Sequence, residues 1–561
     1  MILDLSVQGK LSIEDAILID KMAPKVQKEY NKFIGQVIRE NKLDGLHLLI
    51  SVCSRDPSRS LILPFLCKVL LLKEKLKQGK KITSIIVENR LMLKVVYSIL
   101  DQLDQKIPVR INQRKFYIWI ILLSWISFLK SLYWIFLSWL WPRLTKVYKK
   151  RPKESIVFVD NFILLDSFTD EGEFVDRYYT GYDSYLTNEQ NQKIWYSPTL
   201  FGFRSLSQYL KMSIQSKKSR HNFLFQESWL TLHDYMHALY LTSILPLKVK
   251  KSSLFMGLDI QQLLISEARK DIFSPSLVMS ICKFKFIKNL QKEKVEICQV
   301  VNWHENQNID KALNLSFHQY YPSVIVKGYQ GYVSPPYEAH KIPQSFELEN
   351  STLPSQLHVI SENYKKTILD SCPDLNVRVS SAFRFSYLHD VNRKGVDLNI
   401  PTILIALPMD ITESINILAA CSQLHILVNT KINILVKHHP TYSSHIFTKK
   451  VPEFLDNAFT PTNRSMSSLL ETISLLVSSA SSTCAEAMFL GIPVAVHGNR
   501  YGVTMNPIAE VKDSAKNIVF YSQKQLAGFV NIALENDNKK SAEQYFFMDN
   551  SLSAHKLFVC K

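Results

Sequence analysis

Residues 473–499, ISLLVSSASSTCAEAMFLGIPVAVHGN, decide the fold of this chain. The apolar run 473–477 predicts a β-strand, and residues 484–490 predict a short helix that Gly491 ends. Pro493 then begins a second apolar run, which predicts the next strand. Between the first strand and the helix stand five small hydroxyl residues: Ser478, Ser479, Ser481, Ser482 and Thr483. The order of strand, small-residue loop, helix and strand is typical of a parallel α/β domain.

The serine loop has the chemistry of a phosphate cradle. A helix N-terminus presents unpaired N–H groups and a partial positive charge, and serine hydroxyls add donors without blocking close approach. We therefore expect the hydroxyl residues from Ser479 to Thr483 to bind the phosphates of a donor. Glu486, in the first helical turn, is the candidate for binding a ribose or a base. The alternative is that the serines only cap the helix and Glu486 only complements its dipole.

A basic cluster follows a second apolar run. Residues 431–440, KINILVKHHP, predict a strand that ends in Lys437, His438, His439 and Pro440. Ligands of open α/β sheets bind at the carboxyl ends of the strands, so this cluster and the serine loop are expected to meet at one crevice. Lysine and histidine there can hold a nucleotide phosphate or protonate a leaving phosphate. The alternative is a pair of solvated histidines before a proline that ends the strand.

These two motifs together carry a resemblance. K-x-H-P after one strand and S-S-x-S-S/T-x-x-E-A-x-x-x-G-I-P-V after a later one resemble the C-terminal domain of GT-B glycosyltransferases, above all bacterial sialyl-, polysialyl- and Kdo-type transferases and the related teichoic-acid glycerophosphotransferases. Three upstream stretches resemble a bacterial family of surface carbohydrate (O-antigen) biosynthesis proteins. They are WHENQNIDKAL at 303–313, KGYQG at 327–331 and RVSSAFR at 378–384.

The resemblance implies an α/β fold of the GT-B type, with two Rossmann-like, doubly wound domains that face a cleft. It also implies metal-independent chemistry, a nucleotide-sugar as donor substrate and no further cofactor. Among the carriers, a cytidine nucleotide such as CMP is favoured. His439 and Lys437 would offset the charge on the departing nucleotide, which is the group that most needs stabilisation. Arg384 is a further candidate for contact with phosphate or acceptor.

A carboxylate near the middle of the chain is the candidate catalytic base. Residues 295–301 predict a strand that delivers Trp303, His304 and Glu305 to its carboxyl end. A glycosyl acceptor hydroxyl needs a base within hydrogen-bond reach, and Glu305 is the first candidate and His304 the second. This role presumes inversion at the anomeric carbon. The alternative is that Glu305 caps the helix that begins near Ile309.

The pattern along the chain predicts four parts. We expect a helical segment over 1–45, a Rossmann-like acceptor domain over 46–362, a nucleotide-sugar-binding Rossmann-like domain over 363–535 and a tail over 536–561. The resemblance further implies that the terminal helices pack back across the domains. The length of 561 residues is sufficient for two or three separate cores.

Two short runs are predicted as strands at the start of these domains. Residues 46–52, LHLLISV, predict the first strand of the acceptor domain, and residues 377–380 predict a strand of the nucleotide-sugar domain. Arg55 and Arg59 lie in the loop after the first of these runs. They are candidates for contact with an anionic acceptor, or else they belong to a solvated turn.

The most apolar segment is FYIWIILLSWISFLKSLYWIFLSWLWP at 116–142. Its length permits a transmembrane helix, but a single crossing would separate strands that belong to one sheet, and Lys130 would lie at the middle of the bilayer. We therefore expect two short aromatic helices, or one bent helix, in the membrane interface, within a membrane-associating insertion over 116–153. Its basic end, 143–153, adds attraction to anionic lipid. The alternative is a buried core helix.

Composition limits the classes of binding partner and the cell compartment that we expect for this protein. The formal net charge is +17, yet no zinc-finger spacing, RNP-like run or arginine-rich tract is present, which argues against nucleic acid. The eight cysteines are scattered without C-x-x-C pairs, which predicts reduced thiols. The first twenty residues are too acidic for a signal peptide. We expect a cytoplasmic protein, peripheral or monotopic on the inner membrane and in contact with an anionic membrane surface.

One pair of histidines has metal-ligand spacing. His233 and His237 lie four residues apart in a predicted helix, which places both rings on one face. No third ligand stands nearby in the sequence, so we expect ordinary, partly buried histidines and no metal site.

The sequence therefore predicts a glycosyltransferase for a glycan or glycolipid acceptor in surface polysaccharide or lipopolysaccharide synthesis. A CDP-glycerol- or CDP-ribitol-type glycerophosphotransferase is the second possibility, because it shares the K-x-H-P and serine-loop pattern. A non-catalytic GT-B-like scaffold of a polysaccharide assembly complex is the third.

Overall fold

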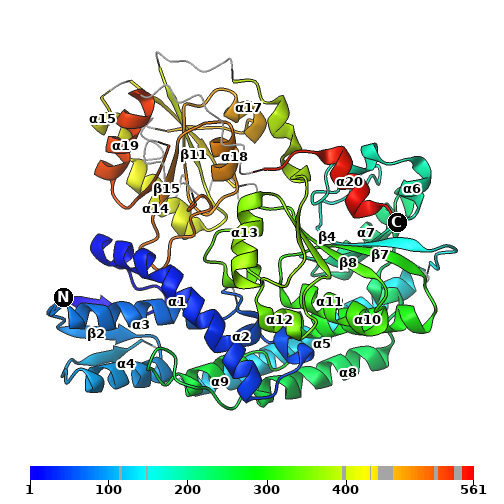
Figure 1. The fold of residues 1–561 in the computed structure, drawn as a ribbon, viewed down its shortest axis with the longest axis horizontal. Coiled ribbons are helices and arrows are strands. Elements are labelled where there is room, and N and C mark those ends of the chain that lie inside the picture. Colours follow the sequence, from blue (N-terminus) through cyan, green and yellow to red (C-terminus); the bar gives the residue numbers. More distant parts are fainter. Residues whose placement is uncertain are drawn as a thin grey trace.

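The computed structural model describes residues 1–57, 59–112, 116–146, 150–393, 400–429, 431–439, 459–510, 516–535 and 546–560. Their strands form three sheets of three, seven and six strands, and every pairing in these sheets is parallel. Figure 1 shows the six-stranded sheet in the upper part of the molecule and the seven-stranded sheet below it. The small sheet has the order β1-β2-β3. Its strands are β1 (Ile2–Asp4), β2 (Ser84–Val87) and β3 (Val109–Ile111).

The seven-stranded sheet has the order β10-β9-β8-β7-β4-β5-β6. The direction of winding reverses between β4 and β7, where Asp160 pairs in register with Asn302. This is the strand order of a doubly wound Rossmann-like sheet with one further strand at its edge. Its strands are β4 (Ile156–Ile163), β5 (Ile194–Leu200), β6 (Asn222–Phe223), β7 (Ile297–Trp303), β8 (Ile325–Gln330), β9 (Gln356–Val359) and β10 (Val377–Val379).

The six-stranded sheet has the order β13-β12-β11-β14-β15-β16 and reverses between β11 and β14. Its strands are β11 (Thr402–Ala406), β12 (Asn433–Lys437), β13 (Thr460–Pro461), β14 (Leu475–Ser478), β15 (Val494–His497) and β16 (Asn517–Phe520). The order is that of a Rossmann-like sheet. The predicted α/β class with two doubly wound, GT-B-like sheets is therefore confirmed.

Helices cover both faces of the two large sheets. On one face of the seven-stranded sheet, the ring of Phe158 lies 5.3 Å from that of Phe317 in α11 (Asn308–Tyr320) and 6.3 Å from that of Phe286 in α10 (Pro275–Lys292). In the six-stranded sheet, Ile403 shares a core cluster with residues of α14 (Ile411–Cys421) and α19 (Gln523–Glu535). Leu404 shares one with residues of α17 (Met466–Leu470) and α18 (Thr483–Phe489). Alternate residues of a strand point to opposite faces, so both faces of each sheet are buried.

The helices have the following bounds in chain order. In the first half they are α1 (Ile13–Glu40), α2 (Ser51–Ser54), α3 (Ile62–Lys77), α4 (Arg90–Gln102), α5 (Phe116–Leu144), α6 (Asn188–Gln192), α7 (Leu206–Lys218), α8 (Leu232–Ile244), α9 (Gln261–Arg269) and α10 (Pro275–Lys292). In the second half they are α11 (Asn308–Tyr320), α12 (Ser345–Glu349), α13 (Glu362–Ser371), α14 (Ile411–Cys421), α15 (Leu424–Leu427), α17 (Met466–Leu470), α18 (Thr483–Phe489), α19 (Gln523–Glu535) and α20 (Asn550–Phe558). The 3-10 helices used below are η1 (Gly45–Leu49), η3 (Gln226–Ser228) and η6 (Phe383–Asp390).

The start of the chain differs from the prediction. Residues 46–52 were expected to form a strand, but they form η1 and the beginning of α2, with Leu48, Leu49 and Ile50 fully buried. A short apolar run does not distinguish a strand from a buried helical turn, and here Asp44 caps the turn by accepting from the backbone N–H of Leu46 at 3.1 Å. Strand β2 pairs with β1 and β3 in the small sheet, outside the seven-stranded sheet.

The predicted boundary at residue 362 also needs correction. Strand β10 was assigned to the nucleotide-sugar domain, but it pairs with β9 and so belongs to the seven-stranded sheet. The crossover helix α13 between these two strands has the short loops of an ordinary βαβ unit. The first strand of the six-stranded sheet is β11.

The end of the chain returns to the seven-stranded sheet, as the resemblance implied. The ring of Phe558 in α20 stacks on that of Tyr182 with centroids 4.0 Å apart, and Lys327 donates to the carbonyl of Lys556 at 2.5 Å. Cys298 of β7 and Cys560 are joined by a disulfide, so the expectation that all eight cysteines are reduced is wrong for this pair. The spacing of 262 residues between them gave no sign of the pairing. The other six cysteines are free and buried.

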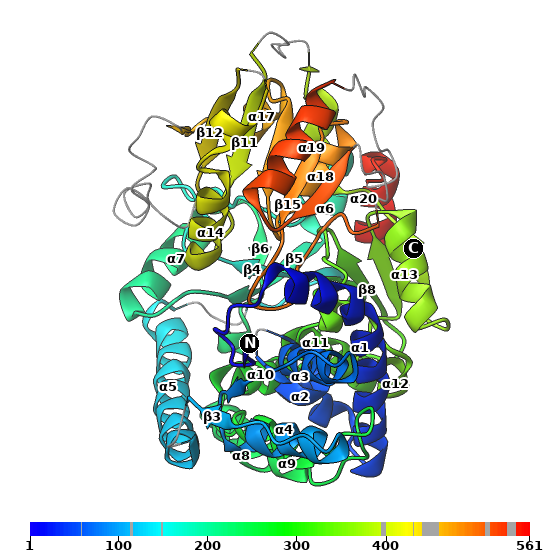
Figure 2. The same ribbon diagram turned by 90° about the vertical axis from the view of Figure 1, so that its left-hand side faces the viewer.

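Helix α5 is one continuous helix and not two. Figure 2 shows it standing along the edge of the molecule. One face contacts the protein: the Ser131 hydroxyl donates to the carbonyl of Phe273 at 2.7 Å, and Trp141 lies against Tyr209 and Phe225. Residues 122–144 have the length and hydropathy of a membrane span, with 22% of the apolar window buried. The alternative of a fully buried core helix is therefore wrong.

Candidate active site

Glu305 lies at the carboxyl edge of the seven-stranded sheet, two residues after β7. Its side chain is half-buried, and both oxygens accept hydrogen bonds, from Trp303 Nε1 at 2.8 Å and from Gln307 Nε2 at 3.0 Å. The ring of Tyr178 lies 4.8 Å from that of Trp303. Burial and the nearby charge of Glu305 raise the pKa of Tyr178 to about 12. The predicted base is thus oriented by two donors beside an aromatic wall.

The alternative role of Glu305 as a helix cap is not what the structure has. Asp310 fills this role, because its Oδ2 accepts from the backbone N–H of Glu305 and of Gln307, both at 3.0 Å. Burial raises the pKa of Asp310 well above its ordinary value, and the charges of Asp160 and Glu305 add to this shift. The Glu305 carboxylate is therefore not the acceptor for these two N–H groups.

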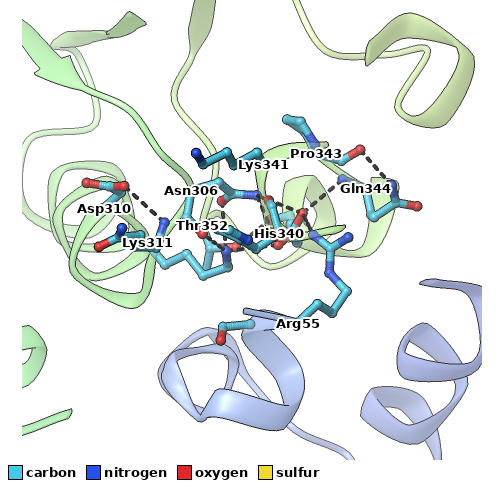
Figure 3. A network of polar contacts seen from close by, with 12 residues as sticks. Arg55, Asn306, Asp310, Lys311, His340, Lys341, Pro343, Gln344 and Thr352 are labelled. Atoms are coloured by element: carbon cyan, nitrogen blue, oxygen red, sulfur yellow. Dashed lines mark hydrogen bonds and ion pairs between the residues drawn. The ribbon is translucent and has the colours of Figure 1, made fainter. Parts of the chain in front are cut away.

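The turn after Glu305 rests on a buried polar network, which Figure 3 shows from close by. Asn306 has a left-handed backbone with φ of 57°, and its side-chain amide donates to the carbonyl of His340 at 2.7 Å. Lys311 donates to Asn306 Oδ1 at 2.8 Å. Glu347 forms ion pairs with Lys311 at 3.0 Å and with Arg55 at 2.7 Å. All three charged side chains have no exposed surface.

This network settles the role of Arg55. The sequence suggested contact with an anionic acceptor or a solvated turn, but the guanidinium is buried between α12 and the turn at Ala339, whose carbonyl accepts from it at 2.7 Å. Burial alone would raise the pKa of Glu347, but Arg55 and Lys311 hold it below its ordinary value. Arg59 likewise pairs with Asp271 at 2.8 Å. Both arginines serve the structure.

His304 does not have the properties of a base. It is completely buried, and burial together with the charge of Lys311 lowers its pKa to about 3. A group with that pKa is neutral at pH 7 and a weak acceptor of protons. Its position inside the fold also keeps it away from any acceptor hydroxyl, so Glu305 is the remaining candidate of the two.

The serine loop joins β14 to α18 as predicted. Ser481 Oγ lies 2.9 Å from Thr483 Oγ1, and Ser482 Oγ donates to Glu486 Oε1 at 3.0 Å. The backbone N–H groups of residues 483–486 all bond within the loop, so the open helix terminus that the sequence suggested is already filled. Ser481 and Ser482 remain half-exposed, whereas Ser479 and Thr483 are buried. The hydroxyls, and not the helix N–H groups, are what this loop presents.

Glu486 is buried and already has two partners. Besides Ser482, it accepts a hydrogen bond from the hydroxyl of Tyr387 in η6. Burial raises its pKa, and these two hydrogen bonds together with the charge of Arg384 oppose that shift. The carboxylate therefore joins the serine loop to η6 in this conformation. Contact of Glu486 with a ribose or a base stays a prediction.

Arg384 lies between the two large sheets. It is exposed, and its charge acts both on Glu486 in α18 and on Tyr178 beside Glu305. The residue follows β10, at the carboxyl edge of the seven-stranded sheet. Like Glu486, it has surroundings that include elements following strands of both sheets.

The basic cluster lies at the end of β12. Lys437 Nζ donates to the carbonyl of Arg464 at 2.6 Å, and burial lowers the pKa of Lys437. His439 is half-buried, and burial and the neighbouring His438 lower its pKa. Strand β12 lies beside β11, which lies beside β14, so the cluster shares a sheet edge with the serine loop. Pro440, the last residue of the motif, lies outside the described residues.

A polar cavity of about 740 Å³ opens at the carboxyl edge of the six-stranded sheet. Asp410 and Glu413 border it after β11, His497 at the end of β15, and Ser522 after β16. The Glu413 carboxyl lies beside the hydroxyl of Ser479, which connects the cavity to the serine loop. Its volume is that of a small-molecule site. The edge of the sheet that the strand order marks for ligand binding is therefore hollow.

The N-terminal segment forms the other wall of this cavity. Val7, Gln8 and Lys10 line it, and Arg500 donates through Nη2 to the carbonyl of Leu11 at 2.7 Å. Burial and the charges of Arg500 and Lys10 lower the pKa of His497 to about 4. The lining thus combines two cations, Lys10 and Arg500, with the acidic residues Asp410 and Glu413, while its histidine is neutral at pH 7.

The sequence did not predict most of the residues that line this cavity. His497 and Asn499 stood inside the quoted stretch 473–499, and their place directly after a strand of the sheet was a usable signal. Lys10 had no signal, because its position depends on contacts across almost 490 residues of sequence, such as that between Leu11 and Arg500. The segment 1–45 had been assigned no role in a site.

The two histidines with metal-ligand spacing lie elsewhere, on α8. The rings of His233 and His237 are 6.1 Å apart, and His237 Nδ1 lies 2.6 Å from Lys285 Nζ. Among the residues that the structure describes, no group of three or more His, Cys, Asp or Glu side chains is arranged to hold a metal ion.

Comparison with known proteins gives remote similarities only. No family model matches the chain, and no curated protein matches it. Among solved structures, MnaA of S. aureus with UDP is 11% identical, with 70% of this chain and 94% of that chain covered and a TM-score of 0.38. The lipopolysaccharide outer core galactosyltransferase WaaB is 10% identical, with 72% and 99% covered and a TM-score of 0.41. UDP-GlcNAc 2-epimerase of Methanocaldococcus jannaschii is 15% identical, with 50% and 80% covered and a TM-score of 0.34.

Proposed function

We propose that this chain is a metal-independent glycosyltransferase. It would move a sugar from a nucleotide-activated donor, with CMP as the favoured carrier, to a surface polysaccharide or lipopolysaccharide acceptor. The observation that carries the proposal is the polar cavity at the carboxyl edge of the six-stranded sheet, which Lys10 and Arg500 line together with Asp410 and Glu413. Two doubly wound sheets whose facing edges hold a nucleotide pocket on one side and a carboxylate on the other suit transfer between two substrates.

In this proposal the donor lies in the cavity. Lys10 and Arg500 supply positive charge for a phosphate, and Ser481 and Ser482 supply hydroxyl donors from the adjoining loop. His439 and Lys437 reach the same edge from β12. As the bond from the anomeric carbon to the donor phosphate oxygen breaks, negative charge grows on that oxygen, and fixed cations stabilise it.

The acceptor lies on the side of Glu305. The carboxylate takes the proton of the acceptor hydroxyl while that oxygen bonds to the anomeric carbon, so the configuration inverts. Trp303 and Gln307 hold the carboxylate in place, and Lys311 and Glu347 fix the turn that follows it. Arg384, between the two sheets, meets the donor phosphate or the acceptor.

The proposal also includes a location on the membrane. An exposed apolar helix beside exposed lysines and arginines suits a protein that rests on the cytoplasmic face of the inner membrane, where a lipid-linked acceptor is found. No role for nucleic acid is proposed.

A transfer assay with membranes from the source cells tests the function. Radiolabelled CMP-, UDP- and GDP-sugars are offered beside CDP-[³H]glycerol, with wild type, Glu305→Gln and His439→Ala. We expect label from a sugar in the acceptor and a loss of at least 100-fold in kcat for Glu305→Gln with unchanged circular dichroism, since a general base contributes about 10² to 10⁴ in rate.

The control is Glu293→Gln, which changes an exposed ion pair with Arg151 far from β7's carboxyl end. Label from glycerol phosphate and from no sugar would make the chain a glycerophosphotransferase. If transfer continues in both site variants, or if no donor supports any transfer, the function that remains is that of a non-catalytic scaffold.

A further inference from the structure

The first half of α5 borders a second cavity, which has no part in the candidate active site. Its volume is about 650 Å³, and its walls come from α4, α5, α9 and the turn after α9. Most of the lining surface is apolar: Leu91, Trp125, Phe128, Ile265, Ile272 and Phe273. A cavity of this size with such walls has the character of a site for an aliphatic chain.

The helix beside this cavity shows an apolar face to solvent. Leu122, Trp125, Leu129, Tyr133 and Phe136 recur at helical spacing, and between 46% and 62% of each side chain is exposed. The opposite face is packed on the protein through Phe128 against Phe273 and Trp134 against Tyr235. Monomeric soluble proteins rarely expose such a continuous apolar face, which marks a surface for a membrane or a partner.

The charges around the cavity distinguish between a membrane lipid and a protein partner as its occupant. Of the described residues that line the cavity, Arg269 is the only charged one, and it is exposed. Within the described parts of the chain, its guanidinium has no ion-pair partner or side-chain acceptor. Arg90 and Lys94, both exposed, lie on α4 next to the lining residue Leu91. An apolar cavity with a cation at its rim complements a molecule that has a long aliphatic chain and one anionic group.

We propose that this cavity holds one acyl chain of an anionic phospholipid from the bilayer on which α5 rests, with the lipid phosphate paired to Arg269. The exposed face of α5 lies in the lipid interface, and the acyl chain occupies the space among α4, α5 and α9 that Trp125 helps to line. The site anchors the protein to one class of lipid. It does not depend on the sugar-transfer chemistry, because none of its residues borders the cavity at the six-stranded sheet.

Native mass spectrometry of the detergent-purified full chain tests the site. Phosphatidylglycerol or phosphatidylcholine with the same acyl chains is added at equal concentration. We expect one phosphatidylglycerol per chain, retained at least fivefold more than phosphatidylcholine. Ile265→Trp fills the cavity and should remove the bound lipid of either kind. Arg269→Glu, at an exposed position, should abolish the preference for phosphatidylglycerol.

Lys292→Glu is the matched control. Lys292, like Arg269, is an exposed cation that ends a helix, so reversal of its charge has the same effect on a helix dipole. Unlike Arg269, Lys292 does not line the cavity. It should retain the wild-type preference. Flotation with phosphatidylcholine and phosphatidylglycerol vesicles distinguishes lipid binding in the cavity from membrane binding by the exposed face of α5. Ile265→Trp leaves that face intact, so this variant should still float with the vesicles.

Three results would overturn the proposal. They are equal retention of the two lipids by wild type, an undiminished preference in Arg269→Glu, and a dimer through α5 that binds no lipid. Arg269→Glu keeps the test valid if Ile265→Trp does not fold, since the Arg269 side chain is exposed.

Discussion

At the scale of single residues, the turn after β7 shows how a buried charge cluster positions a carboxylate. Asn306 accepts a left-handed conformation that costs most residues about 1 to 2 kcal/mol, and Lys311 and Glu347 hold it there. Removing one member of a buried ion pair typically costs about 3 to 5 kcal/mol, so the turn is fixed. The sequence predicted that Glu305 ends a strand. It could not predict Arg55 or Glu347 as part of the support, because they lie far from it along the chain.

A second buried carboxyl gives a test of pH dependence. Glu227 in η3 is fully buried, and burial raises its pKa from 4.5 to about 7. The folded state therefore favours the protonated form, so the contribution of Glu227 to stability is highest below pH 4.5 and falls as the pH rises from there to 7. The loss amounts to about 3 kcal/mol.

Glu227→Gln removes this titration, and its melting temperature should exceed that of wild type by several degrees at pH 8. At pH 4.5 to 5 the two proteins should melt at nearly the same temperature. Differential scanning calorimetry at both values checks the prediction. The exposed Glu189→Gln is the control and should show no pH-dependent difference. A constant difference at both values would mean that Glu227 is not the titrating group.

At the scale of elements, the sequence predicted best where a segment is long or periodic. Strands β11, β12, β14 and β15 and the helix α18 were found because strongly apolar runs alternate with helical ones. The run at 46–52 led to a wrong prediction of a strand, because a short buried helical turn and a buried strand have the same apolar composition. Helix α20 shows a third case, in which a local pattern predicts the helix but its contact Tyr182 is distant in the sequence. The same holds for Cys298, the disulfide partner of Cys560 just after the helix.

Helix α20 provides a test of this long-range contact. Phe558 is 1% exposed, and its ring stacks on that of Tyr182. Phe558→Ala should lower the free energy of unfolding by about 3 to 4 kcal/mol, because it removes a buried aromatic ring and leaves a cavity. Leu552→Ala on the same helix should cost less than about 0.5 kcal/mol, since 45% of that side chain is exposed. Urea unfolding measures both, and equal losses would contradict the docking of α20.

At the scale of the whole molecule, the six-stranded sheet and the N-terminal segment enclose one polar cavity. The sequence predicted both sheets and the serine loop, because local periodicity and strand-end residues carry that information. It did not predict that the first ten residues close the cavity, or that the helix N–H groups of α18 are already bonded. Both depend on tertiary contacts that no single stretch records.

The central claim is that this cavity binds a nucleotide. Its most direct test is a thermal-shift titration of the detergent-purified protein with CMP, CDP, UMP, UDP, GDP and ADP, because a ligand of the folded state raises the melting temperature by mass action. Wild type is compared with Lys10→Gln, which removes an exposed cation of the cavity wall, and with Lys21→Gln, which removes an exposed cation of α1 that does not line it.

The account predicts a shift with one nucleotide, expected to be a cytidine nucleotide, that saturates in wild type and in Lys21→Gln. In Lys10→Gln the dissociation constant should rise about fivefold, corresponding to roughly 1 kcal/mol for one exposed charge. No shift with any nucleotide, or a shift that is unchanged in Lys10→Gln, would contradict the placement of the donor in this cavity.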